Sequence, residues 1–208
     1  AISPAMLQKA LSADVKDTFN MVSVDGDTST NDMVCVLANG LAGNPEITET
    51  GKDFNAFRRA LNKVTTYLCR CIAKDGEGAT KLLECKVTGA KTKNAAKLVA
   101  KSVIKSSLFK AAMFGADANW GRVLCAVGYS GADVDVSKVD VSFKSRFGRI
   151  DVCKNGSGIE FSEEEAKKVL GADEIQILIE LNDKSGKATA WGCDLTYDYV
   201  KINGDYRT

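Results

Sequence analysis

Two kinds of apolar spacing alternate along the chain, and this alternation constrains the fold more than any other feature of the sequence. Apolar residues recur at helical spacing over residues 54–72 and again over residues 94–111. Every second residue is apolar at 83–87, 139–143 and 175–181, a spacing typical of strands. Long helices and strands therefore interleave without a strict βαβ repeat. We expect a fold of the α/β class, or α+β, with mixed sheets packed on long helices.

Shorter patterns predict the remaining elements. The continuous apolar run Met33–Ala38 is consistent with a buried strand, and Val123–Val127 is a second candidate strand. Ser162 and the glutamates that follow it have the form of a capping box, which opens a short helix. The turn-forming residues Asn182–Gly186 predict a hairpin that leads into a last strand-rich segment, Thr189–Ile202.

The best position for a domain boundary is the segment 128–136. No internal repeat, low-complexity segment or linker forces a division there. We divide the chain into an α/β part over residues 1–128 and a C-terminal mixed-sheet part over residues 129–208, packed against the first.

The chain contains no histidine, so a Ser-His-Asp or Cys-His site cannot be assembled from its residues alone. Its seven cysteines are odd in number and form no C-x-x-C pair, which argues against a zinc site or a disulfide framework. We predict free thiols in a reducing cytoplasm. Cys35, Cys85 and Cys125 lie in apolar runs that resemble strands, and we expect these three to be buried and unreactive.

Charge gives no indication of a polyanionic partner. Lysine plus arginine number 28 against 27 for aspartate plus glutamate, a net charge of +1. This balance provides no electrostatic reason to expect nucleic acid or an acidic membrane surface. No stretch approaches the apolar length of a membrane span, and no basic-then-apolar signal segment opens the chain. We expect a cytoplasmic chain.

The segment Asp25–Asp32 combines three carboxylates with three hydroxyl side chains. Such a loop can bind a metal ion, bind an amine, or satisfy its own backbone through Asx and Ser/Thr turns. It lacks the spacing of a calcium loop that ends in a bidentate glutamate. We favour the turns, because these residue types most often serve turns, and we predict no metal site.

Glu77 lies between Gly76 and Gly78. A glutamate between glycines can approach a ligand closely and offer its charge to an ammonium group. A solvated turn explains the same three residues, and the pattern by itself favours that second interpretation.

A third polar cluster occupies residues 117–122. We expect Trp120 to pack against the following sheet, and Asn119 and Arg122 to bond loop carbonyls. Neither G-x-G-x-x-G nor G-x-x-x-x-G-K-[ST] occurs in the sequence, so a glycine-rich phosphate loop is not expected.

Three strings resemble signatures of the ornithine acetyltransferase family. They are VDGDTSTND at 24–32, FGADANWGRV at 114–123 and YDYVKINGDYRT at 197–208. Because they lie near the start, middle and end in the family's order, the resemblance covers essentially the whole chain. Ala118 departs from the proline usual in the middle string, which affects only the local loop.

The resemblance implies an N-terminal-nucleophile-like fold and the β subunit of a glutamate N-acetyltransferase. Such an enzyme moves acetyl from N2-acetylornithine to glutamate in arginine biosynthesis, by a ping-pong route through an acyl-threonine. The precursor cuts itself before the nucleophilic threonine, whose own α-amino group acts as base. No threonine of this sequence matches that position, which the resemblance places upstream of Ala1. We therefore name no catalytic residue in this chain.

The resemblance also implies partners. Activity would require the α chain of the same precursor, which supplies the oxyanion hole, in an α2β2 heterotetramer. The substrates would be N-acetylornithine and glutamate, with no nucleic acid and no membrane. No cofactor is expected, although some family members accept acetyl-CoA as a second donor.

Three positions match substrate-binding residues of the family: Glu77, Asn203 and Thr208. Glu77 would face the amino group of the substrate or the ammonium of the nucleophile. Asn203 and Thr208 would hydrogen-bond the substrate's carboxylate or acetamide. These roles require the C-terminal tail to fold back over the active site.

Two other functions stay open. One is a non-catalytic scaffold chain whose partner supplies all the chemistry. The other is an amidase or aminopeptidase on a similar self-cleaving fold, in which water takes the acyl group in place of glutamate.

Overall fold

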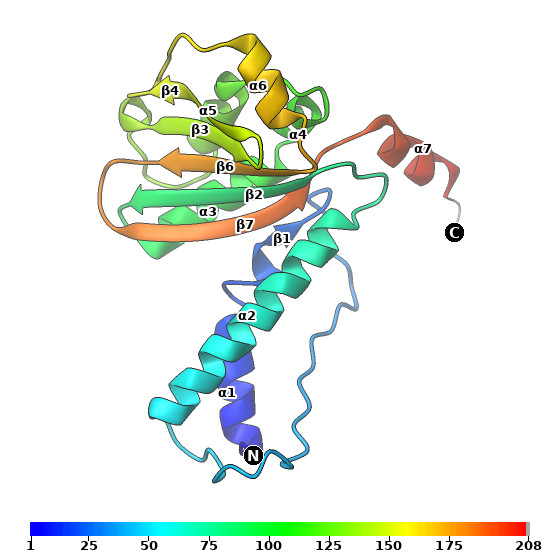
Figure 1. The fold of residues 1–208 in the computed structure, drawn as a ribbon, viewed down its shortest axis with the longest axis vertical. Coiled ribbons are helices and arrows are strands. Elements are labelled where there is room, and N and C mark those ends of the chain that lie inside the picture. Colours follow the sequence, from blue (N-terminus) through cyan, green and yellow to red (C-terminus); the bar gives the residue numbers. More distant parts are fainter. Residues whose placement is uncertain (207–208) are drawn as a thin grey trace.

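The computed structural model describes residues 1–206, so the prediction for Thr208 lies outside the described residues. One seven-stranded mixed sheet dominates the molecule, in the order β1-β7-β2-β6-β3-β4-β5 (Figure 1). Its strands are β1 (Val22–Ser23), β2 (Leu82–Ala90), β3 (Asp140–Ser145), β4 (Gly148–Lys154), β5 (Ser157–Gly158), β6 (Glu174–Glu180) and β7 (Gly186–Cys193). The central strand β2 runs parallel to β6 and antiparallel to β7.

Helices cover one face of this sheet and extend from one of its edges. They are α1 (Pro4–Asp14), α2 (Lys52–Lys74), α3 (Lys93–Lys105), α4 (Ser107–Phe114), α5 (Trp120–Gly128), α6 (Glu163–Leu170) and α7 (Tyr197–Asp205), with single turns η1 (Phe19–Met21) and η2 (Val136–Lys138). In Figure 1, α3, α4 and α5 lie behind the sheet, and α6 packs against β3 and β4. We call β2–β7 with α3–α6 the sheet region.

The core of the sheet region consists of the apolar residues that the sequence pattern places on alternate positions of its strands. On β2 and β6 these are Leu83, Cys85, Val87, Ile175, Ile177 and Ile179, and all are buried. Alternation brings the side chains of one strand to the same face, where the helices cover them. The α/β class with mixed strands packed on helices is confirmed.

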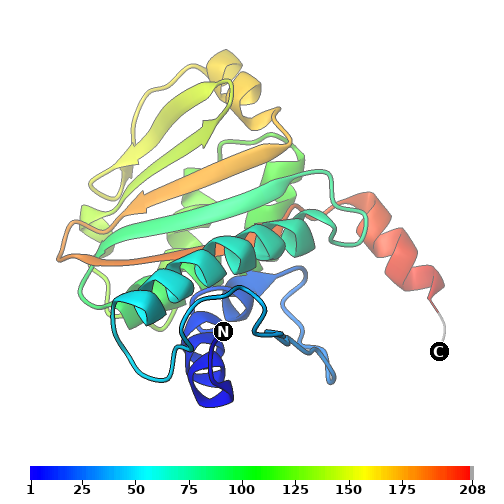
Figure 2. The ribbon, with the colours of Figure 1, turned by 60° about the horizontal axis from the view of Figure 1, so that its bottom comes forward.

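The helices α1 and α2, with the loop 24–51, form a second region that we call the α1–α2 region. Figure 2 shows α2 running past the β7 side of the sheet with α1 next to it. The buried carboxylate of Asp14 joins the two helices, because it accepts hydrogen bonds from Asn62 Nδ2 (2.7 Å) and Thr65 Oγ1 (2.6 Å). The hydroxyl of Thr18 donates a third bond to the same carboxylate.

The expected strand Met33–Ala38 is wrong. The segment belongs to the loop 24–51, with Met33 83% and Leu37 92% exposed. A strand needs a neighbour for its backbone N–H and C=O groups, and no strand among residues 1–206 pairs with this segment. An apolar run by itself does not say whether such a neighbour exists.

Two predictions on α3, α4 and α5 are also wrong. Val123–Val127 is helical, because the Asn119 side chain accepts a hydrogen bond from the Arg122 N–H (3.1 Å) and starts α5. The single helix expected over 94–111 is broken at Ser106, whose extended backbone ends α3 and whose side chain caps α4. Two apolar side chains of the expected helix, Leu98 (40%) and Leu108 (63%), are exposed.

The predicted hairpin at Asn182–Gly186 is wrong, because β2 lies between β6 and β7 in the sheet. The strand-rich segment expected over Thr189–Ile202 is strand only up to Cys193. After it, Thr196 accepts a hydrogen bond from the Tyr199 N–H (3.2 Å) and starts the helix α7. Alternation of large apolar residues does not distinguish the end of a strand from a short capped helix.

The predicted burial is confirmed for one of the three cysteines. Cys85 is buried on β2, and burial raises the pKa of its thiol. Cys35 and Cys125 are exposed, so the prediction is wrong for both. Cys35 lies in the unpaired loop 24–51, and Cys125 belongs to α5 and not to a buried strand.

The division at 128/129 stays a prediction, although strands from both parts share one sheet: β2 of residues 1–128 pairs with β6 of residues 129–208. Across residues 1–206, every helix is too short or too polar to cross a membrane.

Candidate active site

Glu77 lies in the loop between α2 and β2, and the two glycines beside it are needed for close contacts. Gly78 has a φ of +65°, and a Cβ there would lie 2.6 Å from the backbone N of Tyr199. A Cβ on Gly76 would lie 2.8 Å from Cys193 Sγ. The glycines therefore let this loop pack directly on α7 and on the end of β7.

Asp194, directly after β7, fixes the far end of the same loop. Its Oδ1 accepts hydrogen bonds from the backbone N–H groups of Thr80 (2.8 Å) and Lys81 (2.9 Å), and the Thr80 hydroxyl donates to its Oδ2. With only 3% of its surface exposed, this carboxylate is satisfied by three donors. The direction in which Glu77 leaves the sheet is therefore fixed.

The helix α7 brings Asn203 to Glu77. Asn203 Nδ2 donates a hydrogen bond to Glu77 Oε2 at 2.7 Å. The Thr196 hydroxyl, at the start of α7, donates to the Gly78 carbonyl at 2.7 Å. The structure thus brings together two of the three residues expected in the site, on a helix that projects from the end of the sheet (Figure 1).

Tyr199 joins this site, and the sequence interpretation missed it. It lies one helical turn before Asn203, and its hydroxyl donates to Asp25 Oδ2 at 3.0 Å. Burial raises the pKa of Tyr199, and the carboxylates of Asp25, Glu77 and Asp27 raise it further. The spacing of four residues from Asn203 was the available signal, but it has meaning only on a helix.

The acidic loop 25–32 satisfies part of its own backbone. Asp25 Oδ1 accepts a hydrogen bond from the Asp27 N–H (2.9 Å), an Asx turn. In the part of the chain that the structure describes, no three His, Cys, Asp or Glu side chains gather as metal ligands would. The turn-forming interpretation therefore accounts for this contact, and Asp25 has the added role of receiving Tyr199.

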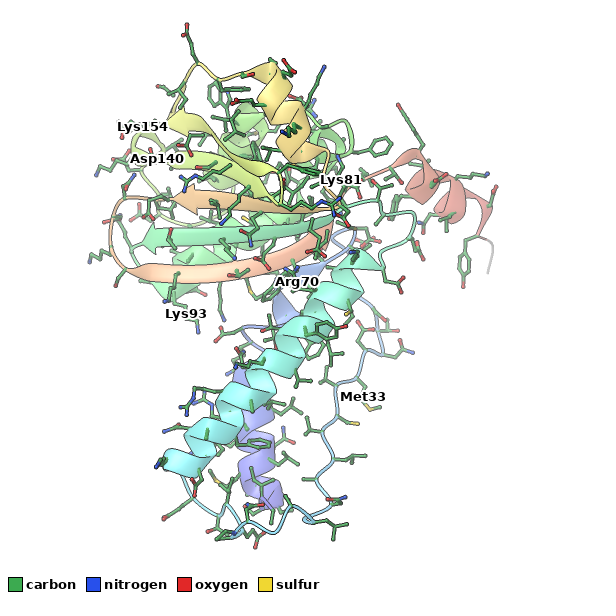
Figure 3. The ribbon with its side chains drawn as sticks, in the orientation of Figure 1. Met33, Arg70, Lys81, Lys93, Asp140 and Lys154 are labelled. Atoms are coloured by element: carbon green, nitrogen blue, oxygen red, sulfur yellow. The ribbon has the colours of Figure 1, made fainter. Side chains whose placement is uncertain are left out.

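Lys81 lies four residues after Glu77, directly before β2. Lys81 Nζ donates to the Met113 carbonyl at 2.5 Å, at the end of the sheet from which α7 leaves (Figure 3). Burial lowers the pKa of Lys81, and the carboxylate of Asp194 offsets part of that shift.

Glu77, Asn203 and Tyr199 offer a carboxylate, an amide and a phenol on one open surface, since the side chains of Glu77 and Asn203 are exposed. A carboxylate suits an ammonium group, and an amide can both donate to and accept from a carboxylate or an acetamide. These groups can bind and orient an acylated amino acid. They do not include a nucleophile.

Comparison with known proteins identifies the family. The model of the ArgJ family matches residues 1–208.

The chain belongs to the ArgJ family.

Two relatives are each 55% identical to the chain: "Arginine biosynthesis bifunctional protein ArgJ 1" of Clostridium acetobutylicum and "Arginine biosynthesis bifunctional protein ArgJ" of Caldanaerobacter subterraneus subsp. tengcongensis. The matches cover 100% of this chain but 51% and 52% of those proteins. The ArgJ-family chain therefore spans about half the length of the relatives it matches.

A crystal structure of "Arginine biosynthesis bifunctional protein argJ" from Bacillus halodurans has the same fold. It superimposes with a TM-score of 0.93 at 48% identity, covering 99% of this chain and 95% of that chain. The resemblance to the ornithine acetyltransferase family and to its fold is confirmed.

The polar cluster at residues 117–122, within the middle signature of this ArgJ-family chain, has a structural role. Trp120 packs on β5, where a Cβ on Gly158 would lie 2.4 Å from the indole ring. Arg122 Nη1 donates to the Leu108 carbonyl at 2.8 Å, and Asn119 caps α5. The expected indole packing is confirmed. The expected bonds to loop carbonyls are wrong, because Asn119 accepts from a backbone N–H and Arg122 bonds a carbonyl of the helix α4.

A cavity of about 790 Å³ lies over the open face of the sheet, away from Glu77, and is lined by residues that include Glu84, Lys86 and Trp191. Glu84 pairs with Lys86 (2.7 Å) and Arg70 (2.6 Å) and accepts a bond from Trp191 Nε1 (2.9 Å). Burial alone would raise the pKa of Glu84, but these partners hold it below its usual value. Because Arg70 belongs to α2, we interpret this network as the attachment of α2 to the sheet.

Proposed function

We propose that this chain is the β subunit of a glutamate N-acetyltransferase, which transfers acetyl from N2-acetylornithine to glutamate in arginine biosynthesis in the cytoplasm. One observation carries the proposal: in an ArgJ-family chain, the carboxylate of Glu77 meets the amide of Asn203 at 2.7 Å. The contact joins two segments that the resemblance assigns to one substrate site.

In this proposal Glu77 binds the ammonium group of the ornithine or glutamate skeleton. Asn203 orients the carboxylate or acetamide, together with Thr208. The nucleophilic threonine, its α-amino base and the oxyanion hole come from residues beyond this sequence. The threonine hydroxyl attacks the acetamide carbonyl and ornithine leaves as the amine. The glutamate amine then attacks the acetyl ester and releases the threonine hydroxyl.

The partner would be the α chain of the same precursor, in an α2β2 assembly. Support comes from apolar side chains that stay in water in the α1–α2 region. These are Met33, Leu37 and Leu41 of the loop 24–51 and Val64, Tyr67, Leu68 and Ile72 of α2. Figure 3 shows Met33 on this loop. Seven large apolar side chains left in water within one region favour an interaction surface there. The matched relatives are about twice as long as this chain, which leaves ample sequence to cover it.

Exposure of the site gives a second reason for a covering chain. An acetyl ester on an enzyme hydrolyses unless water is excluded. Glu77 and Asn203 are exposed in this chain, so another chain would have to complete and close the site. No cofactor is needed for this exchange, and acetyl-CoA would serve only as a second donor.

The test is to produce the chain together with its α partner and the upstream threonine, and to follow [¹⁴C]acetyl from N-acetylornithine. The proposal predicts labelled N-acetylglutamate with parallel-line, ping-pong kinetics. Labelled acetate formed whether or not glutamate is present would indicate the amidase or aminopeptidase. Transfer that persists unchanged without this chain would leave it the role of a scaffold.

A further inference from the structure

Lys110 of α4 is 2% exposed, although it carries a charge. Its Nζ donates to the Val24 carbonyl, to the Cys193 carbonyl (2.7 Å) and to Cys193 Sγ (3.5 Å). Three partners match the three N–H bonds of an ammonium group. Within residues 1–206 no carboxylate lies at ion-pair distance from Lys110 Nζ. No direct ion pair there offsets the free-energy cost of burying the ammonium group. An apolar side chain of similar length would fill the same space at lower cost.

The two carbonyls bound by Lys110 each precede an acidic residue of the site. Val24 precedes Asp25, which receives the hydroxyl of Tyr199 on α7. Cys193 precedes Asp194, which holds the loop of Glu77 through the N–H groups of residues 80 and 81. One ammonium group therefore fixes the bases of two chain segments that are distant in sequence.

These two segments meet again at the substrate site. The first segment carries Asp25, which bonds Tyr199 on the same helix as Asn203. The second carries Asp194, which bonds residues 80 and 81 of the Glu77 loop. The hydrogen bond between Asn203 and Glu77 then joins α7 to the Glu77 loop. The backbone carbonyl of Lys110 also accepts the N–H of Leu195 (3.3 Å), between Asp194 and α7.

We propose that Lys110 is a positioning residue, whose buried ammonium holds the Glu77 loop and α7 in register so that Glu77 and Asn203 form one substrate site. Its effect on turnover rests on the proposed function. Its effect on the two segments does not, because the contacts lie within this chain.

Hydrogen exchange of the assembled α/β enzyme tests the positioning directly, with Lys110→Met compared with Asp14→Asn. Asp14 is also a buried polar group, but it joins α1 to α2 and not the Glu77 loop to α7. We expect Lys110→Met to raise amide exchange about tenfold or more at residues 76–81 and 196–203, since local opening there loses its anchor. Asp14→Asn should raise exchange in α1 and α2 only. Unchanged exchange at both segments in Lys110→Met would overturn the proposal.

A double-mutant cycle adds a functional readout. Lys110→Met should lower kcat/KM for N-acetylornithine about tenfold alone, and far less in a Glu77→Gln background, because both changes act through one contact. Fully additive losses would contradict a positioning role. If the wild-type enzyme transfers no acetyl, the proposed function fails, while the exchange experiment still decides the role of Lys110.

Lys110→Gln serves if Lys110→Met does not fold. Its amide donates to a carbonyl without a buried charge, but it has two N–H bonds and a shorter reach. We expect exchange in Lys110→Gln to rise above the wild-type rate at one or both segments, and wild-type exchange at both would reject the proposal.

Discussion

The sheet region buries most of its apolar residues, whereas the α1–α2 region leaves many of its own in water. Ile177 on β6 is fully covered, but Leu37 in the loop 24–51 is 92% exposed. Ile177 lies in an alternating apolar pattern and Leu37 in a continuous apolar run, and the sequence predicts a strand for both. The difference teaches that one region finds its packing partner within this chain and the other does not. The site of Glu77 and Asn203 lies between the sheet region and the α1–α2 region, at the end of the sheet from which α7 leaves (Figure 1).

The largest contrast should appear in stability. Ile177→Ala leaves a cavity in the core and should lower the free energy of unfolding by about 2–5 kcal/mol. Leu37→Ala in the chain alone should change it by less than about 0.5 kcal/mol, because this side chain contacts little. Urea denaturation of the two variants measures both values. Equal losses would mean that the loop 24–51 packs as firmly as the sheet, and the comparison would fail.

A pair of glycines sharpens the comparison at smaller scale. Gly78 (φ +65°) and Gly43 (φ +73°) have similar backbones, but a Cβ at Gly78 meets Tyr199 whereas a Cβ at Gly43 meets nothing within 4 Å. Gly43→Ala should cost about 1 kcal/mol from backbone strain alone. Gly78→Ala should cost about 1–3 kcal/mol, because α7 must also move. The two melting curves give the difference, and equal costs would show that α7 does not press on the Glu77 loop.

Thiol labelling should distinguish the regions without any mutation. Cys35 is exposed and should react within minutes with a maleimide, as peptide mapping by mass spectrometry would show. Cys85 is buried, and burial raises its pKa, so it should react only on unfolding. With the α chain bound, Cys35 should become protected. Rapid labelling of Cys35 in the assembled enzyme would show that the α chain does not cover the loop 24–51.

The sheet could be predicted where local pattern and tertiary contact agree. Alternation at 83–87, 139–143 and 175–181 identified β2, β3 and β6, because each strand has one face on the helices. The strand prediction from the continuous apolar run Met33–Ala38 was wrong, because no strand of the described residues pairs with this segment. The order of the strands could not be predicted either, because the placement of β2 between β6 and β7 depends on contacts between distant segments.

The site was predictable in part for a similar reason. Two glycines around Glu77 gave a local signal, and the family resemblance added Asn203 on an element that is a helix and not a strand. Tyr199 and Asp194 act through partners 174 and 114 residues away, Asp25 and Thr80, so no local pattern indicates them. The same holds for Lys110, whose charge gives no sign in the sequence that it is buried.

The most direct test of the account is Glu77→Gln in the assembled enzyme, with kcat/KM for N-acetylornithine and the melting temperature measured together. Loss of a charge partner in a closed site costs about 2–4 kcal/mol, so kcat/KM should fall roughly 30- to 1,000-fold. The melting temperature should stay the same, because this side chain is exposed in the chain alone. Glu160→Gln, another exposed carboxylate, is the matched control and should change neither quantity. Wild-type kcat/KM in Glu77→Gln would contradict the account and remove Glu77 from the substrate site.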